Sequence, residues 1–246
     1  MKKINIVGII FILLTTFTSR SQEEFSTEMD YVIQLLQINS ENVDHQLSIV
    51  KPMRYIPEMM AFAILEKVGE SDSSEEDHKK FRCHVVLYNA SDKLITNRFI
   101  IENLESDAIR LSRISFDFAP YMVKTDKRAF GIRISYSNFS RANPYEEEQL
   151  TLFIQENDKL IPVLKDYPSY LSSGLWDTNC AGEFNEKKSV IFIENTSTRG
   201  FFDIKVNNKE VKTINEVVSG DCKVRENAIK STTYLVYLNG SYQVKR

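Results

Sequence analysis

From residue 43 to the C-terminus, apolar side chains recur at every second position in short runs, and this alternation constrains the fold more than any other feature of the chain. The runs are rich in β-branched and aromatic residues, and clusters of Asn, Asp, Gly, Ser and Pro separate them. Residues 111–118 and 130–136 show the pattern most clearly. Because alternating apolar and polar positions are typical of half-buried antiparallel strands, the sequence predicts a mainly β fold.

The clearest turn lies near the C-terminus. Asn239 and Gly240 separate an apolar run at residues 234–238 from a second one at residues 242–244. Both turn residues tolerate the positive φ that a two-residue type I′ turn requires. The sequence therefore predicts a β-hairpin at this position.

A similar hairpin pattern occurs at two earlier places in the chain. Residues 87–95 and 152–161 each run from an apolar and aromatic strand through a polar turn and a Lys to an apolar pair, and residues 236–242 follow this order more loosely. The sequence therefore predicts antiparallel meanders. An aromatic run precedes each of the three segments, at residues 61–64, 129–132 and 201–204.

These hairpins divide the chain into three four-strand units at residues 43–104, 109–171 and 172–246, which we expect within a single β-rich domain of residues 43–246. Shared turn chemistry without true repetition is the alternative. Propeller blades usually recur every ~40–50 residues in four or more copies. Three longer and unequal spacings favour a sandwich-like or repeat-like arrangement instead.

One short helix is expected before the strands, in the segment of residues 22–42. Ser26 or Thr27 can cap its N-terminus, and the acidic Glu28 and Asp30 lie in its first turn. Membrane-surface helices carry Lys and Arg on their polar face, so we expect the apolar stripe of this helix to pack on the domain. Four apolar residues at helical spacing form that stripe: Met29, Val32, Ile33 and Leu36.

Residues 1–21 have the features of a cleavable signal peptide. Two lysines precede an apolar run at residues 4–17, and Ser19 and Ser21 fit the small positions before a cleavage site. An uncleaved anchor is the alternative, but the run is shorter than the ~20 residues needed to cross a bilayer. No Cys lies near the cleavage site, so we expect no lipid anchor. The sequence predicts a soluble protein that is periplasmic or secreted.

The charge of the chain disfavours two classes of partner. The formal net charge is −3, and it becomes about −6 when Lys2, Lys3 and Arg20 leave with the signal peptide. Nucleic acids and anionic membranes attract basic proteins, so neither is expected as a partner.

Three cysteines in an oxidising compartment predict one disulfide and one remaining thiol. Cys180 and Cys222 each lie in a polar segment close to a glycine, and we expect them to pair. Cys83 lies within an apolar run and is expected to be a buried strand residue. A bridge to Cys83 and three free thiols are the alternatives.

Motifs for metal, cofactor and nucleophile chemistry are missing from the sequence. His45, His78 and His84 do not form a His-x-His or His-Glu-x-x-His pattern, and no Gly-rich phosphate loop or Gly-x-Ser-x-Gly motif occurs. We therefore expect no metal and no cofactor, and catalysis is disfavoured. Hydrolysis by a pair of carboxylates stays open, because the separation of two acids depends on the fold.

The first candidate site surrounds the single Trp of the chain. Trp176 lies close to Asp177, Asn179 and Glu183. An aromatic ring beside acids and an amide suits a glycan, because the sugar ring stacks on the indole while polar groups bind its hydroxyls. Alternatively, Trp176 is a core residue and the neighbouring Cys180 only cross-links the fold.

The second candidate site is the polar segment of residues 140–148. Asn143 can cap a helix whose first residue would be Pro144, and Glu146 is placed to complete a capping box. This predicts a single helical turn between two strands. Arg141, Tyr145 and Glu146 would then be exposed for contacts with a partner, unless the segment is an ordinary solvated loop.

Together these features favour an exported, soluble, β-rich binding protein of a bacterial envelope or exterior. Its expected partner is another protein, in the manner of an inhibitor or immunity protein, and a glycan is the alternative partner. A carboxylate-dependent hydrolase of cell-wall or polysaccharide substrates is a second hypothesis. A structural component of a surface complex is a third, and exposed unpaired edge strands would be its mark.

Overall fold

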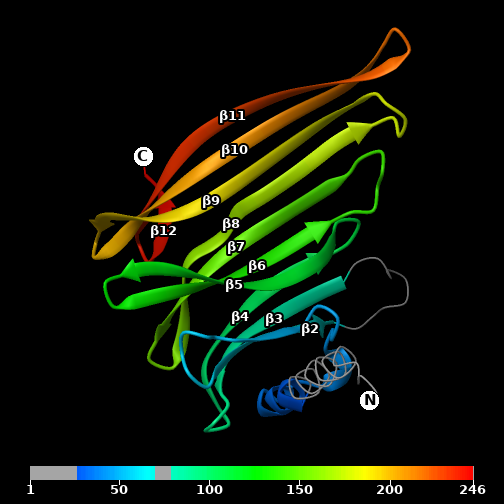
Figure 1. The fold of residues 1–246 in the computed structure, drawn as a ribbon. Coiled ribbons are helices and arrows are strands. Elements are labelled where there is room, and N and C mark those ends of the chain that lie inside the picture. The colour runs from blue at the N-terminus through cyan, green and yellow to red at the C-terminus, as the bar shows by residue number, and fades with distance from the viewer. Residues whose placement is uncertain (1–26, 70–78, 246) are drawn as a thin grey trace, which may run out of the picture.

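A computed structural model describes residues 27–69 and 79–245 of the chain. Within these ranges the protein is mainly β, with a large sheet of twelve strands and one short N-terminal helix (Figure 1). This confirms the predicted fold class. The predicted signal peptide, residues 1–21, lies outside the described residues. None of the helices in the described ranges has the length and apolar character needed to span a membrane.

The strands follow one another closely along the chain. They are β1 Ile49–Pro52, β2 Met59–Val68, β3 Lys79–Asn89, β4 Leu94–Ser106, β5 Arg110–Lys124, β6 Lys127–Ser137, β7 Tyr145–Glu156, β8 Lys159–Trp176, β9 Gly182–Thr198, β10 Phe201–Val218, β11 Asp221–Leu238 and β12 Ser241–Val244. A 3₁₀ turn, η1 Ser40–Asn42, precedes them.

The sheet consists of three antiparallel meanders, β1–β4, β5–β8 and β9–β12. The similar hairpins of the sequence are β3–β4, β7–β8 and β11–β12. Strand β8 connects the meanders, because it pairs with β7 on one side and with both β4 and β9 on the other. Its contact with β4 is parallel and consists of Lys159 opposite Arg98, whereas residues 170–176 pair with β9.

Two-residue turns close the last three hairpins. Asn239 and Gly240 have φ values of 51° and 87°, which confirms the predicted hairpin between β11 and β12. The same pair of positive angles occurs at residues 199–200 and 219–220, where Gly again takes the second position. Strands β9, β10 and β11 are therefore nearly equal in length and fold back on one another without long loops.

The sheet folds onto itself and buries a core between two of its parts. Side chains from β2 and β3 pack against side chains from β5 and β6, with Phe153 of β7 among them. The members of this core include Ala63, Val85, Ile114 and Ile132, which are almost completely buried. Apolar burial of this kind stabilises a fold by roughly 25 cal/mol per Å².

Two further cores cover other parts of the sheet. In the helix, which spans residues 27–35, Val32 and Ile33 pack against Phe62 of β2 and Val86 of β3. This confirms the predicted burial of the apolar stripe. The remaining core joins the second and third meanders, and it includes Leu152, Val163, Val206 and Leu235.

The distal parts of β8–β11 extend beyond these cores and form what we call the arm, residues 170–188 and 208–234 (Figure 1). Many of its side chains are exposed on both faces of the sheet, including Leu175, Val217, Val224 and Ile229. The arm is therefore a single layer of sheet that packs on little else.

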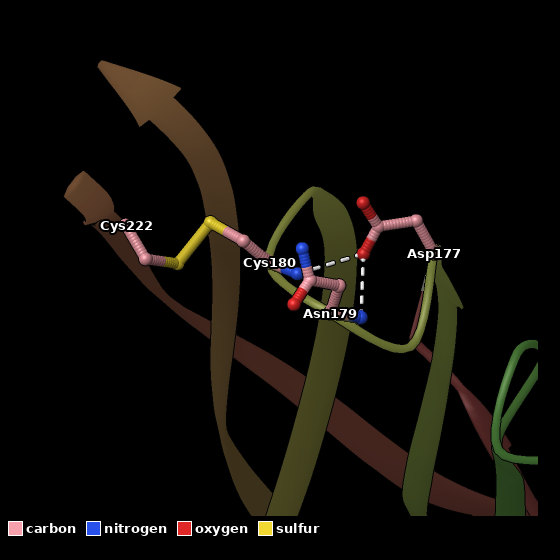
Figure 2. Close-up of a disulfide and its surroundings, with 4 residues drawn as sticks. All are labelled: Asp177, Asn179, Cys180 and Cys222. Atoms are coloured by element: carbon pink, nitrogen blue, oxygen red, sulfur yellow. Dashed lines mark hydrogen bonds between the residues drawn. A yellow bond between two sulfur atoms is a disulfide. The ribbon is translucent and has the colours of Figure 1, made fainter. Parts of the chain in front are cut away.

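The predicted disulfide between Cys180 and Cys222 is present (Figure 2). It links the connection between β8 and β9 to the first residues of β11, with 5.7 Å between the two Cα atoms. The disulfide therefore holds the end of the arm together. Cys83 is a free thiol on β3 and is fully buried, and this burial raises its pKa to about 12.

Candidate binding site

The carboxylate of Asp177 shapes the loop that presents Cys180. One of its oxygens, Oδ1, accepts hydrogen bonds from the backbone N–H groups of Asn179 and Cys180, both at 2.8 Å (Figure 2). These hydrogen bonds lower the pKa of Asp177. Asp177 therefore has a structural role next to the disulfide, and the backbone of Asn179 takes part in it.

Trp176 and Glu183 lie on opposite faces of the sheet. Trp176 is half-buried and stands opposite Gly182, whereas Glu183 is one residue further along β9 and stands opposite Leu175. The carboxylate of Glu183 pairs with the ammonium group of Lys212 at 2.6 Å, and the hydrogen bond from Lys212 lowers its pKa. The structure therefore does not gather these predicted residues around one cleft.

The predicted helical turn near Asn143 is wrong. Residues 138–144 form a loop, and β7 begins at Tyr145. The carbonyl oxygens of Ala142 and Pro144 accept hydrogen bonds from the backbone N–H groups of Trp176 and Gly174 on β8. These long-range bonds hold the segment extended alongside β8, so the local capping signals do not produce a helix.

The candidate residues of this loop do not form one site. Arg141 is exposed, whereas Tyr145 donates a hydrogen bond from its hydroxyl to Glu147 at 2.7 Å. Glu146 is next to Tyr145 on the same strand, and neighbouring strand residues point to opposite faces. The side chain of Glu146 lines a cavity that also contains Arg133.

That cavity, of about 600 Å³, is lined by charged groups that pair with one another. The guanidinium of Arg133 lies 2.7 Å from the carboxylate of Asp117 and 2.6 Å from that of Glu148, and Arg113 contacts Glu148 at 3.4 Å. Because Arg133 and Arg113 have acidic partners within the chain, we interpret this cluster as a set of structural ion pairs. It offers little unbalanced charge to a ligand.

A second cavity, of about 510 Å³, has a different balance of charge. We call it the cationic cleft, and its lining residues are Lys51, Pro52, Arg54, Tyr55, Phe118 and Arg128. No acid lines it, and none of its three cations forms an ion pair with the described part of the chain.

The two aromatic rings and Arg128 give the cationic cleft a fixed geometry. The guanidinium of Arg128 lies 3.7 Å from the centre of the Tyr55 ring, and its Nη2 donates a hydrogen bond to the carbonyl oxygen of Phe118 at 2.7 Å. Burial raises the pKa of Tyr55 to about 12, although the charge of Arg128 opposes this rise. Tyr55 is therefore neutral at ordinary pH, and the positive charge of the cleft is not cancelled by it.

The sequence did not reveal the cationic cleft. Lys51, Arg54 and Tyr55 lie within five consecutive residues, and this cluster of two cations and a ring was the only local signal. Phe118 and Arg128 come from β5 and β6, more than sixty residues further along the chain. They reach Tyr55 because the sheet folds onto itself around the core between β2–β3 and β5–β6.

No family model, no curated protein and no solved structure matches this chain. The protein is therefore described by its own fold and site. It is a mainly β protein with a disulfide-linked arm and a cationic, partly aromatic cleft. In the described residues, no group of three or more His, Cys, Asp and Glu side chains is arranged to hold a metal ion.

Proposed function

We propose that this is an exported, soluble binding protein of a bacterial envelope or exterior, and that its cationic cleft binds an acidic segment of another protein. The observation that carries the proposal is the grouping of Lys51, Arg54 and Arg128 around Tyr55 without a lining acid. The grouping gathers three positive charges in one place on a chain whose formal net charge is −3.

The chemistry of the cleft fits carboxylate groups. Arginine side chains bind carboxylates with two parallel hydrogen bonds, and lysine adds a mobile point charge. The rings of Tyr55 and Phe118 offer an apolar surface to the neighbouring side chains of a bound peptide. Because Arg128 is already held by Phe118 and Tyr55, little side-chain entropy is lost when it binds. An inhibitor or immunity role is a concrete form of this function.

The export part of the proposal has two supports. Residues 1–21 have the pattern of a signal peptide, and the disulfide between Cys180 and Cys222 suits an oxidising compartment. A periplasmic or secreted location agrees with both.

A carboxylate-dependent hydrolase is less well supported than a binding protein. Such an enzyme needs two carboxyl groups that face a shared substrate about 5 to 10 Å apart. Asp177 uses its carboxylate to hold a loop, and Glu183 is paired with Lys212. A glycan at Trp176 also loses support, because Glu183 lies on the other face of the sheet.

Binding of an acidic peptide tests the proposed function. The probe is a fluorescent pentapeptide with two Glu on each side of a Phe, and its partner probe has Gln in place of each Glu. We expect the full-length exported protein to bind the acidic probe more tightly, and Lys51→Glu/Arg54→Glu to weaken this binding at least tenfold, or about 1.4 kcal/mol. Fluorescence anisotropy at two salt concentrations measures both effects.

The control is Lys67→Glu, which makes one such charge reversal at an exposed residue near the far end of β2. We expect this variant to bind the acidic probe as the unaltered protein does. Equal binding of the acidic and neutral probes, or binding that is unchanged in Lys51→Glu/Arg54→Glu, contradicts the proposal.

A further inference from the structure

The outer edge of β11 is unpaired over most of its length. Strand β11 pairs with β10 from Asp221 to Leu235, but among the described residues only β12 pairs with its other side, at residues 235–238. Every second residue between residues 221 and 233 therefore presents backbone N–H and C=O groups along the edge of the arm that no described strand pairs with (Figure 1), whereas the carbonyl oxygen of Tyr234 accepts a hydrogen bond from the backbone N–H of Lys245. Natural proteins usually keep such edges short or cover them, because an open edge recruits another strand.

A row of lysines ends at this edge. Lys188 of β9, Lys209 of β10 and Lys230 of β11 stand directly opposite one another, so their side chains share one face of the arm. Lys188 contacts Glu186 at 3.2 Å, whereas Lys209 and Lys230 have no ion-pair partner among the described residues. Like charges opposite each other destabilise a sheet. An acidic residue in the next strand, opposite Lys230, would offset this repulsion.

Strand β11 itself supplies an acid at the required spacing. When two copies of a strand pair antiparallel about a two-fold axis, each residue meets one that lies equally far from the axis on the other side. With Ala228 at the axis, Glu226 of each copy stands opposite Lys230 of the other. Two Glu–Lys pairs then form, and the paired segment runs over residues 223–233.

Charge distinguishes this register from its neighbours. Five registers pair at least nine residues of the edge between residues 221 and 233, with the axis at residue 225, 226, 227, 228 or 229. An axis at Arg225 or Glu226 brings two identical charges together, and an axis at residue 227 or 229 makes no opposite-charge pair. Only the axis at Ala228 pairs opposite charges directly, and it also places the smallest side chains of the edge at the centre.

We propose that two copies of this protein pair antiparallel along β11, with Ala228 on the two-fold axis, so that their arms form one continuous sheet. The edge satisfies its backbone groups in this way, and the lysine row gains Glu226 of the second copy. Val224 and Ile229, which are 60% and 59% exposed, gain Thr232 and Asn227 of the second copy as cross-strand neighbours. None of these residues lines the cationic cleft, so the dimer does not depend on the proposed function.

Charge exchange tests this dimer. We expect sedimentation of the full-length exported protein to show a concentration-dependent dimer, and Glu226→Lys and Lys230→Glu each to raise the dissociation constant at least tenfold. The double variant Glu226→Lys/Lys230→Glu re-forms both pairs with their signs exchanged, so we expect it to dimerise nearly as the unaltered protein does. Lys67→Glu serves as the control for the loss of a positive charge elsewhere.

A cross-linking variant keeps the test valid if a charge variant folds poorly. Ala228→Cys places two thiols next to each other across the axis, because directly opposite Cβ atoms lie about 4.5 to 5.5 Å apart. We expect a covalent dimer from Ala228→Cys and none from Ile229→Cys, whose thiols would lie on opposite sides of the axis. A protein that stays monomeric up to about 1 mM, the range of weak contacts, overturns the proposal. A dimer that both single charge variants leave unchanged also overturns it.

The peptide-binding experiment and the dimer experiment test different residues, so one proposal can be contradicted while the other holds. Loss of peptide binding in Lys51→Glu/Arg54→Glu should leave the dimer intact, and dissociation of the dimer in Glu226→Lys should leave peptide binding intact.

Discussion

At the scale of single residues, Asp117 combines partial burial with several hydrogen bonds to its carboxylate. Burial alone would raise its pKa, but hydrogen bonds from the backbone N–H of Ala119, the guanidinium of Arg133 and the hydroxyl of Tyr121 together lower it. Burial alone would lower the pKa of Arg133, but its hydrogen bonds to the carboxylates of Asp117 and Glu148 raise it. The pair therefore stabilises the folded state while Asp117 is ionised.

Replacing Asp117 with Asn should make the free energy of unfolding smaller by about 2 kcal/mol at neutral pH, because Arg133 loses a charged partner. The pKa of Asp117 is lower in the folded state than its unfolded value of about 4. Its contribution is therefore complete above pH 4 and is lost as the pH falls further. We expect the difference between the two proteins to shrink in acid, as measured by urea unfolding at pH 7 and pH 3.

Asp126→Asn is the matched control, because Asp126 is exposed in the turn between β5 and β6. This change should alter the stability by less than about 0.5 kcal/mol at either pH. A destabilisation in Asp117→Asn that stays the same from pH 7 to pH 3 would show that the lost contact is not electrostatic.

At the scale of elements, the arm depends on its disulfide more than the rest of the sheet does. Cys180 and Cys222 are 42 residues apart in sequence, and a cross-link over such a loop stabilises a fold by up to about 4 kcal/mol through the unfolded state. The segments that it joins are exposed on both faces. Strand pairing and exposed ion pairs hold them in place, and none of the three cores extends to them.

The variant Cys180→Ala/Cys222→Ala should therefore loosen the arm before it affects the cores. We expect faster amide hydrogen exchange in residues 182–188 and 211–230, with little change in β2 and β3. Hydrogen exchange followed by mass spectrometry locates the effect. Cys83→Ala removes a thiol from the core on β3 and should leave exchange in the arm unchanged. Equal acceleration across all strands in Cys180→Ala/Cys222→Ala would contradict the local role.

The elements that the sequence predicted correctly are those specified by neighbouring residues. Asn239 and Gly240 carry their own turn geometry, and the buried positions of the N-terminal helix follow from its spacing. Near Asn143 the helix-capping pattern did not produce the predicted helical turn. The carbonyls of Ala142 and Pro144 instead accept hydrogen bonds from β8, about thirty residues away. The cationic cleft could not be predicted from the sequence for a related reason, because Tyr55 and Arg128 come into contact only in the folded sheet.

At the scale of the whole molecule, the sheet divides into a packed body and an exposed arm, and single strands run through both. On β10, Val206 is 0% exposed within the core of the second and third meanders, whereas Val217 is 57% exposed near the end of the arm. Two residues of the same type on one strand therefore experience very different surroundings.

The two valines provide a matched comparison. Val206→Ala should lower the free energy of unfolding by about 2 to 3 kcal/mol, because it removes two buried methyl groups and leaves a cavity. Val217→Ala should change it by less than about 0.5 kcal/mol. Thermal or urea unfolding measures both values. Similar losses for the two variants would mean that the arm is packed against a surface that the monomer does not contain.

If the protein is exported as proposed, the burial of Cys83 has a consequence for the order in which its thiols are oxidised. In a chain that crosses a membrane N-terminus first, Cys83 arrives well before Cys180 and Cys222, because it lies about a hundred residues upstream. If β2 and β3 pack against β5 and β6 as soon as these strands emerge, the thiol of Cys83 is withdrawn from solvent before Cys180 arrives. Correct oxidation then follows from the timing of folding, without a requirement for disulfide reshuffling.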